Sequence, residues 1–119
     1  VYSTTFEIDE KYGTTYHKNF VDYMIYVQEQ DLTVDGAMTD PKGDRSLPPS
    51  RQEDPDIYLR IVEKNKDGII VNSAKAHQTG AVNSHEHLIM PTAAMKEDDK
   101  AYAVSFAVPS DAPGIIMIY

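Results

Sequence analysis

The strongest constraint on the fold is a short turn between two stretches of strand-forming residues. The segments DIYLRIVEK (56–64) and IIVNSAKAH (69–77) are rich in Ile and Val, and they flank Asn65-Lys66-Asp67-Gly68. β-Branched and aromatic residues favour strands, whereas Asp-Gly supplies the backbone conformation that a tight hairpin turn needs. The sequence therefore predicts an antiparallel β-hairpin here.

Four further segments have the composition of short strands: LTVDGAMT (32–39), HEHLIMPT (85–92), AYAVSFAVP (101–109) and GIIMIY (114–119). Before them, residues 14–30 place apolar side chains at helical spacing, so we expect an amphipathic helix with Thr14 or Thr15 as its N-cap. Together these elements predict a mainly β fold, a small β-barrel or sandwich of about six strands with an N-terminal helix.

The same pattern suggests how the 119 residues are organised. Residues 1–30 are expected to form an N-terminal segment with the helix, and residues 31–119 to form the β-domain. The chain begins at Val1 and stops on an apolar run without a polar tail, whereas natural ends are usually polar and exposed. We therefore expect a fragment of a longer polypeptide.

Charge and cysteine content exclude several classes of function. The formal net charge of −8 argues against a general binder of nucleic acid or anionic membranes, because such proteins carry a basic face. No apolar run approaches the roughly 20 residues needed to span a bilayer. The lack of cysteine excludes disulfides and any metal cluster held by thiolates of this chain, and it fits a cytoplasmic setting.

Few residues suggest catalysis or metal binding. His85 and His87 flank Glu86 and would share one face of a strand, as two metal ligands could, but packed or exposed histidines are the simpler interpretation. His17 is interpreted in the same way. The charged run KEDDK (96–100) is expected to be a solvated turn, and the sequence contains no familiar catalytic or nucleotide-binding motif.

The segment AMTDPKGDRS (37–46) is the most unusual part of the chain. It leads into a loop over residues 41–55 that contains four prolines, and loops of this length in compact domains are often functional. Gly43 would let backbone N–H groups approach an anion closely, while Lys42 and Arg45 add positive charge. A binding loop for an anionic ligand is therefore one interpretation.

Alternatives stay open at these positions. Asp40 and Asp44 could brace a purely structural turn through their own backbone. The polar segment Gln78–Gly80 ends the second hairpin run. It could be a plain turn, or its Thr79 hydroxyl could hydrogen-bond the edge of a planar heterocycle.

Together these segments resemble a known flavoprotein domain. AMTDPKGDRS followed by GIIVNSAKAHQTGA resembles the flavin-binding middle domain of the acyl-CoA dehydrogenase-like superfamily, in which two strand ends hold the flavin ring. From about residue 14 to 119, DGAMTDPKGDRS, DPDIYLRIVEKNKDGIIV and AKAHQTGAVNSHE are similar to the 4-hydroxybutyryl-CoA dehydratase/vinylacetyl-CoA Δ-isomerase branch of the 4-hydroxyphenylacetate 3-hydroxylase family. Residues 1–30 would then end a preceding helical domain.

The resemblance implies FAD as the cofactor and assigns residues to it. Thr79 is implied to hydrogen-bond near the reactive edge of the flavin, and such contacts tune the cofactor's electronic properties. The residues implied to contact FAD are Met38, Thr39, Asp40, Pro41, Lys42, Gly43, Asp44, Arg45, His77, Gln78 and Thr79.

The reaction implied by the resemblance converts 4-hydroxybutyryl-CoA to crotonyl-CoA or isomerises vinylacetyl-CoA, in a cytoplasmic homotetramer linked to 4-aminobutyrate fermentation. An iron–sulfur cluster, held by cysteines and a histidine, acts there as a Lewis acid. Because this chain has no cysteine, the cluster ligands and the catalytic bases are expected in flanking helical domains. We therefore expect no catalytic residue and no metal ligand here, and no activity from the chain alone. Its partners would be the acyl-CoA, the flanking domains and further subunits.

Two other functions stay open. One is a flavin-dependent 4-hydroxyphenylacetate 3-hydroxylase, which needs no cluster; that branch is expected to carry His at the position of Gly36 and to lack the HQTG string. The other is a β-domain for binding or assembly without a cofactor, which would leave the complete protein colourless.

Overall fold

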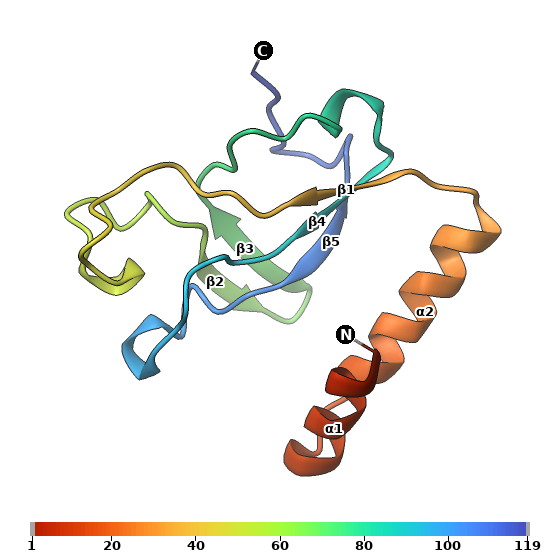
Figure 1. Ribbon diagram of the computed structural model, residues 1–119. Coiled ribbons are helices and arrows are strands. Elements are labelled where there is room, and N and C mark those ends of the chain that lie inside the picture. Colours follow the sequence, from red (N-terminus) through yellow and green to blue (C-terminus); the bar gives the residue numbers. More distant parts are fainter. Residues whose placement is uncertain (1, 119) are drawn as a thin grey trace. The chain divides into compact units, whose positions relative to one another are not determined.

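The computed structural model describes residues 2–118, which form two compact units (Figure 1). The first unit ends at Thr33 and the second begins at Val34, whereas the sequence suggested a division after residue 30. No helix within the described range is long and apolar enough to cross a membrane. The elements are α1 (Tyr2–Tyr12), α2 (Tyr16–Glu29), β1 (Val34–Ala37), η1 (Pro49–Arg51), β2 (Arg60–Asn65), β3 (Gly68–Asn72), η2 (Ala81–Asn83), β4 (Glu86–Ile89), η3 (Glu97–Asp99) and β5 (Phe106–Pro109), where η marks a 3-10 helix.

The first unit is a helical hairpin. α2 confirms the helix predicted over residues 14–30, but α1 was not predicted. Its sequence did contain a signal, because Tyr2 and Phe6 lie one helical turn apart and Gly13 follows the last residue of the helix. Gly13 has a φ of 65°, the left-handed conformation that a glycine commonly supplies just after a helix.

The carboxylate of Asp9, on α1, caps the N-terminus of α2. It accepts the N–H of Tyr16 at 2.9 Å and that of His17 at 2.8 Å. Thr15 is the N-cap residue, as one of the two candidates predicted, but its side chain makes no capping bond, and Thr14 donates its hydroxyl to Asp9. Burial raises the pKa of Asp9, yet the hydrogen bonds that it accepts outweigh burial and hold the pKa below its ordinary value. The cap therefore comes from a neighbouring helix.

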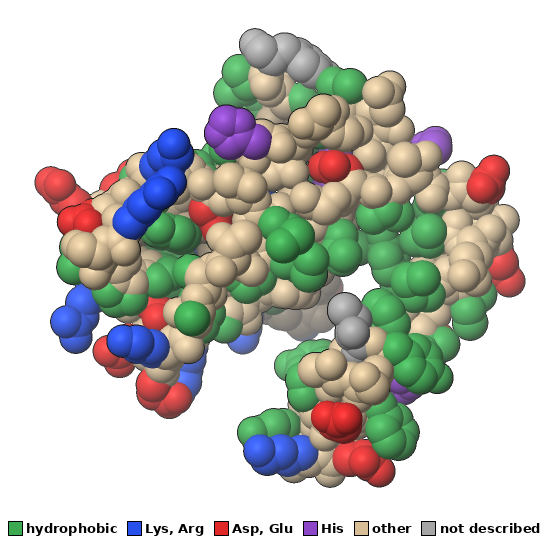
Figure 2. Space-filling view, in the orientation of Figure 1, with side chains coloured by type: hydrophobic (Ala, Val, Ile, Leu, Met, Phe, Trp, Pro, Cys, Tyr) green, Lys and Arg blue, Asp and Glu red, His purple; other side chains and the backbone are tan. Residues whose placement is uncertain are grey.

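Apolar side chains of the hairpin remain at the surface, where Figure 2 shows them in green over the two helices. The rings of Tyr2 and Phe6 meet that of His17 edge-on, with centroids 4.6 and 5.5 Å away. Nevertheless, none of the described side chains of α1 or α2 is buried. The exposed apolar residues are Tyr2, Phe6, Tyr12, Tyr16, Met24, Ile25 and Tyr26.

The second unit contains a mixed three-stranded sheet in the order β1-β4-β5. β1 runs parallel to β4, with Asp35 opposite His87 and Ala37 opposite Ile89, and β5 runs antiparallel to β4. Ala37, Pro49, Ile89 and Tyr102 are the buried apolar residues of the described range. Because parallel neighbours need a long connection, the loop after β1 and the β2–β3 hairpin both lie between β1 and β4 in the chain.

β2 and β3 form the predicted antiparallel hairpin as a second, two-stranded sheet. The side chain of Asn65 accepts the N–H groups of Asp67 at 2.9 Å and Gly68 at 3.1 Å. Gly68 has a φ of 145°, which side-chain-bearing residues rarely adopt. The turn thus depends on the residue types that predicted it.

The strand count differs from the prediction. The described residues form five strands in two separate sheets, which do not close into a barrel, rather than about six in one barrel or sandwich. Residues 114–118 are not a strand, and only β5 of the predicted 101–109 strand is paired. Ile116 and Ile118 are 83% and 92% exposed, so apolar composition alone did not make this run a strand. With two α-helices, the chain as a whole is mixed α and β.

The charged segment 96–100 is a turn whose residues are exposed, as predicted, with the exception of Asp99. The side chain of Asp99 is completely buried. Its Oδ1 accepts the N–H of Ser50 and its Oδ2 that of Lys96, both at 2.9 Å. Hydrogen bonds from Ser50 and Lys96 lower the pKa of Asp99. The carboxylate of Asp99 therefore holds Ser50, in the second half of the 41–55 loop, next to segment 96–100.

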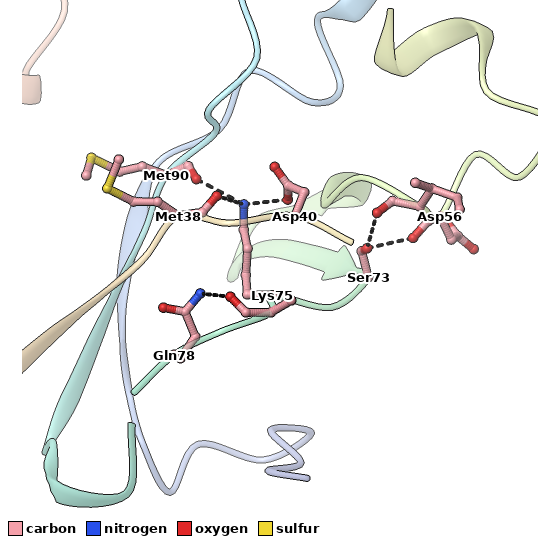
Figure 3. Close-up of polar contacts among 9 residues, drawn as sticks. Met38, Asp40, Asp56, Ser73, Lys75, Gln78 and Met90 are labelled. Atoms are coloured by element: carbon pink, nitrogen blue, oxygen red, sulfur yellow. Dashed lines mark hydrogen bonds and ion pairs between the residues drawn. The ribbon is translucent and has the colours of Figure 1, made fainter. Parts of the chain in front are cut away.

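The buried ammonium of Lys75 joins several segments of the second unit (Figure 3). Its Nζ lies 2.6 Å from Asp40 Oδ1, 2.9 Å from the carbonyl oxygen of Met90 and 3.2 Å from that of Met38. The side chains of Lys75 and Asp40 are only 7% and 6% exposed. Because β1 and β4 are parallel, their carboxyl ends lie side by side, and Lys75 binds the backbone just beyond both.

Replacing either Lys75 or Asp40 alone should lower the stability of this region more than replacing both residues. Lys75→Met leaves a buried, unpaired carboxylate and Asp40→Asn leaves an unbalanced ammonium, so each should lower the free energy of local unfolding by about 3–5 kcal/mol. The double variant removes both charges and should recover most of that loss. Hydrogen exchange at the Ala76 amide, which donates to Thr39, measures the effect. The exposed Lys66→Met is the control, and equal losses in single and double variants would contradict the assignment.

Asp99 should make the stability of the protein depend on acid pH. Because its folded pKa lies below the ordinary 3.8, its stabilising effect is present above about pH 4 and is lost as the pH falls through the folded pKa. Asp99→Asn should therefore lower the free energy of unfolding at neutral pH, and the difference should narrow in acid. Urea unfolding across this range measures it, with the exposed Asp98→Asn as the matched control. A difference that does not change with pH would refute the role.

Candidate functional site

Two polar segments lead in different directions from one backbone contact just beyond the carboxyl end of β1: residues 38–45 leave the sheet, whereas residues 77–80 run back to Asp35 of β1, where a Cβ added to Gly80 would lie 2.7 Å from Oδ1. We call residues 38–45 the ligand loop and residues 77–80 the Thr79 turn. Ala76, directly before the turn, donates its N–H to the carbonyl oxygen of Thr39 at 2.8 Å. Together with the bonds of Lys75, this contact holds the start of the ligand loop against the segment that leads into the turn.

The ligand loop divides into residues that shape it and residues that stay exposed. Asp40 is engaged by Lys75. Asp44 Oδ1 accepts the N–H of Ser46 at 2.8 Å and its hydroxyl at 2.7 Å, and these bonds from Ser46 lower the pKa of Asp44. The two aspartates therefore brace the loop, while Pro41 is half-buried. The exposed residues are Met38, Thr39, Lys42, Arg45 and also Asp44.

Gln52, outside the predicted set, closes the ligand loop. Its Oε1 accepts the N–H of Asp44 at 2.9 Å, and its Nε2 donates to the carbonyl oxygens of Asp44 at 2.8 Å and Leu47 at 3.1 Å. A Cβ added to Gly43 would collide with Gln52 Oε1 and lie 2.9 Å from Ile57 Cγ2. Gly43 does not have a positive φ, so glycine is needed here because the loop is tightly packed.

The Thr79 turn presents His77 and Thr79 at the surface. His77 has a φ of 59°, which is uncommon for a residue with a side chain and tends to occur where function or packing requires it. Gln78, labelled in Figure 3, donates from Nε2 to the carbonyl oxygen of Ala76 at 2.7 Å. Its side chain therefore stabilises the turn, and the imidazole of His77 and the hydroxyl of Thr79 are the groups that a ligand can reach.

The space beside these segments limits how a ligand could bind. A cavity of about 10 Å³ lies next to Lys75 and Asp40, which is room for roughly one water molecule. A flavin ring cannot enter it. A ligand of that size would therefore lie on the exposed surface beside these segments.

Histidines outside the turn show packing contacts. His87 Nδ1 lies 3.7 Å from Asp35 Oδ2, and both side chains are largely buried. His85 precedes β4, and its carbonyl oxygen accepts the N–H of Ser110 at 2.8 Å. Within residues 2–118, no group of three or more His, Asp or Glu residues is arranged to hold a metal ion.

Sequence reasoning missed two residues that shape the site, Lys75 and Gln52. Lys75 lies in a strand-like run between Ala74 and Ala76, small neighbours that leave space around a long side chain, and this was the only local signal. Gln52 lies in an irregular loop without periodicity. Neither partner could be read locally, because Lys75 and Asp40 are 35 positions apart and Gln52 and Asp44 are 8 apart.

Comparison with known proteins relates this geometry to a family. The family model for the N-terminal region of 4-hydroxyphenylacetate 3-hydroxylase matches residues 1–119. The chain is 72% identical over 119 residues to 4-hydroxybutyryl-CoA dehydratase/vinylacetyl-CoA-Δ-isomerase of Clostridium aminobutyricum, which covers all of this chain and 24% of that protein. It is 34% identical over 104 residues to the oxygenase component of 4-hydroxyphenylacetate 3-monooxygenase of Thermus thermophilus, covering 87% of this chain and 21% of that protein. The chain thus spans about a quarter of these relatives' length.

Solved structures agree with the sequence comparison. An oxygen-tolerant archaeal 4-hydroxybutyryl-CoA dehydratase from N. maritimus superimposes with a TM-score of 0.92 at 55% identity, covering 95% of this chain and 23% of that one. The oxygenase component of 4-hydroxyphenylacetate 3-monooxygenase in complex with FAD gives 0.74 at 35% identity, covering 82% and 20%. Because the family model spans every residue and the structures share its fold, the chain belongs to the 4-hydroxyphenylacetate 3-hydroxylase N-terminal family.

Proposed function

We propose that this chain is the FAD-binding part of a 4-hydroxybutyryl-CoA dehydratase/vinylacetyl-CoA Δ-isomerase, which converts 4-hydroxybutyryl-CoA to crotonyl-CoA. The observation that carries this proposal is the 72% identity, over the whole chain, to the enzyme of Clostridium aminobutyricum. Because the chain corresponds to 24% of that enzyme, the reaction belongs to the complete polypeptide. We assign no catalytic residue to this part.

The exposed residues of the ligand loop and the Thr79 turn fit FAD. Lys42 and Arg45 carry positive charge suited to a diphosphate, in a chain whose net charge of −8 would otherwise repel it. The hydroxyl of Thr79 can donate or accept a hydrogen bond at the edge of the flavin ring, with His77 nearby in the same turn. When bound, FAD supplies the one-electron oxidation that allows an unactivated C–H bond to lose its proton.

Other members of the predicted set would act on FAD indirectly. Asp40, Asp44 and Gln78 already hydrogen-bond within the protein, so they would fix the backbone against which the cofactor lies. A relative solved in complex with FAD shares 35% identity with this chain, which supports the choice of cofactor.

An iron–sulfur cluster does not fit this chain. It has no cysteine, and His, Asp and Glu form no metal-binding group within residues 2–118. We therefore place the cluster ligands and the catalytic bases in other domains of the polypeptide. Those domains would complete the reaction centre around the flavin.

The same domains would complete the fold. Ile69 and Ile70 on β3 are exposed, as are Ile116 and Ile118 after β5, and apolar surface of this kind is commonly covered by a partner. We propose that the two sheets form part of a β-barrel or sandwich in the complete enzyme and that the helical hairpin ends a preceding helical domain. The enzyme would be a cytoplasmic homotetramer whose substrate is an acyl-CoA.

Flavin-dependent hydroxylation is the second candidate, favoured by the FAD-bound hydroxylase structure in the same family. Sequence identity supports the dehydratase, at 72% against 34%. Gly36, where the hydroxylases are expected to carry His, supports the same choice. No atom lies within 4 Å of a Cβ built there, so packing alone does not require glycine at this position.

The complete protein should contain both FAD and iron when it is prepared without oxygen. Its visible spectrum should show a flavin absorption band, and metal analysis should find iron, because the proposed reaction uses both groups. FAD without iron would instead indicate a hydroxylase. A colourless protein would contradict both enzyme assignments and support a cofactor-free β-domain.

Thr79→Ala in the complete protein should shift the flavin absorption band and lower turnover roughly tenfold, because the cofactor loses a hydrogen bond that tunes it. Thr92→Ala, the same change at another exposed threonine of the second unit, is the matched control. Spectra and turnover indistinguishable from the unmodified protein would remove Thr79 from the site.

A further inference from the structure

The orientation of the Gln52 side-chain amide is fixed by its partners. The N–H of Asp44 can only donate, so it must face Oε1, whereas the carbonyl oxygens of Asp44 and Leu47 can only accept and must face Nε2. Both hydrogens of the Gln52 amide and its oxygen are therefore engaged within the loop. A carboxylate at this position would keep the acceptor but lose both donors.

These bonds fix the part of the ligand loop that carries its positive charge. The Gln52 side chain accepts the backbone N–H of Asp44 and donates to the backbone carbonyl oxygen of Asp44. The same side chain lies directly against Gly43. Lys42 and Arg45 are the residues on either side of that pair, and both are exposed. The spacing of these two cations therefore depends on Gln52, although Gln52 itself is half-buried.

We propose that Gln52 is a positioning residue that gives the protein its preference for a flavin dinucleotide over a flavin mononucleotide. It acts by holding Lys42 and Arg45 where they bind the diphosphate together. This inference rests on the proposed function, in which the ligand loop takes the diphosphate of FAD. FMN has a single phosphate and no diphosphate, so its binding depends less on the spacing of the two cations.

The test is Gln52→Glu in the complete protein freed of its cofactor. The substitution keeps the size and the acceptor but places negative charge against two carbonyl oxygens. Gln52→Glu combined with Glu53→Gln keeps the net charge constant, because Glu53 is the exposed neighbour. Fluorescence titration should show FAD binding weakened roughly ten- to hundredfold in both variants and FMN binding changed by less than about threefold. Amide exchange at Asp44 should accelerate.

A second variant disturbs the contact between Gln52 and Gly43 by changing Gly43 instead of Gln52. Gly43→Ala drives a methyl group into the Gln52 amide and should shift the FAD-to-FMN preference in the same direction. It introduces no charge, so agreement between the two variants separates the shape of the loop from electrostatic repulsion.

The outcomes distinguish this inference from the function on which it rests. An unchanged FAD-to-FMN preference overturns it. If exchange at Asp44 accelerates while the affinities for both flavins stay unchanged, the loop does not bind the diphosphate and that part of the proposed function fails too; if exchange is also unchanged, only the role of Gln52 fails. Equal losses for both flavins show a structural role alone and also overturn it. An unmodified protein that binds neither flavin refutes the proposed function itself.

Discussion

A single buried ammonium holds together the part of the chain where we propose function. Lys75 bonds three oxygens, from Asp40, Met38 and Met90, so each of its hydrogens has an acceptor. A buried charge without such partners costs several kcal/mol, and few arrangements of these segments would satisfy it. The start of the ligand loop therefore lies against the segment that leads into the Thr79 turn, because one lysine fixes where the loop leaves the sheet.

The charged residues of the ligand loop near Lys75 differ in role, because some already hydrogen-bond within the protein and others do not. Asp40 is buried against Lys75, Asp44 accepts hydrogen bonds from Ser46 at the surface, and the Asp44 amide is bound by Gln52, so this amide is not available to an anion. The exposed Lys42 and Arg45 are left to attract one. The loop is thus better described as a rigid support for two cations than as a nest of free backbone amides.

The chain also leaves many of its large apolar side chains exposed. Its helical hairpin has an internal cap at Asp9, yet no described side chain of either helix is buried. In the second unit, the buried apolar side chains among the described residues are those of Ala37, Pro49, Ile89 and Tyr102. The chain spans about a quarter of its relatives' length, and under the proposed function further domains would bury what is exposed here.

The sequence by itself determined the elements whose cause is local. Asn65, Asp67 and Gly68 determine the hairpin through their own backbone preferences, and the helical spacing of apolar residues determines α2. Residues with unusual composition also marked the two segments of the candidate site. Only the tertiary structure decided that Asp99 is buried, that residues 114–118 are not a strand, and that Lys75 and Gln52 shape the site. Asp99 and Lys75 depend on partners 49 and 35 positions away, and Gln52 bonds across an irregular loop, so the charge or polarity of one residue does not reveal which group will satisfy it.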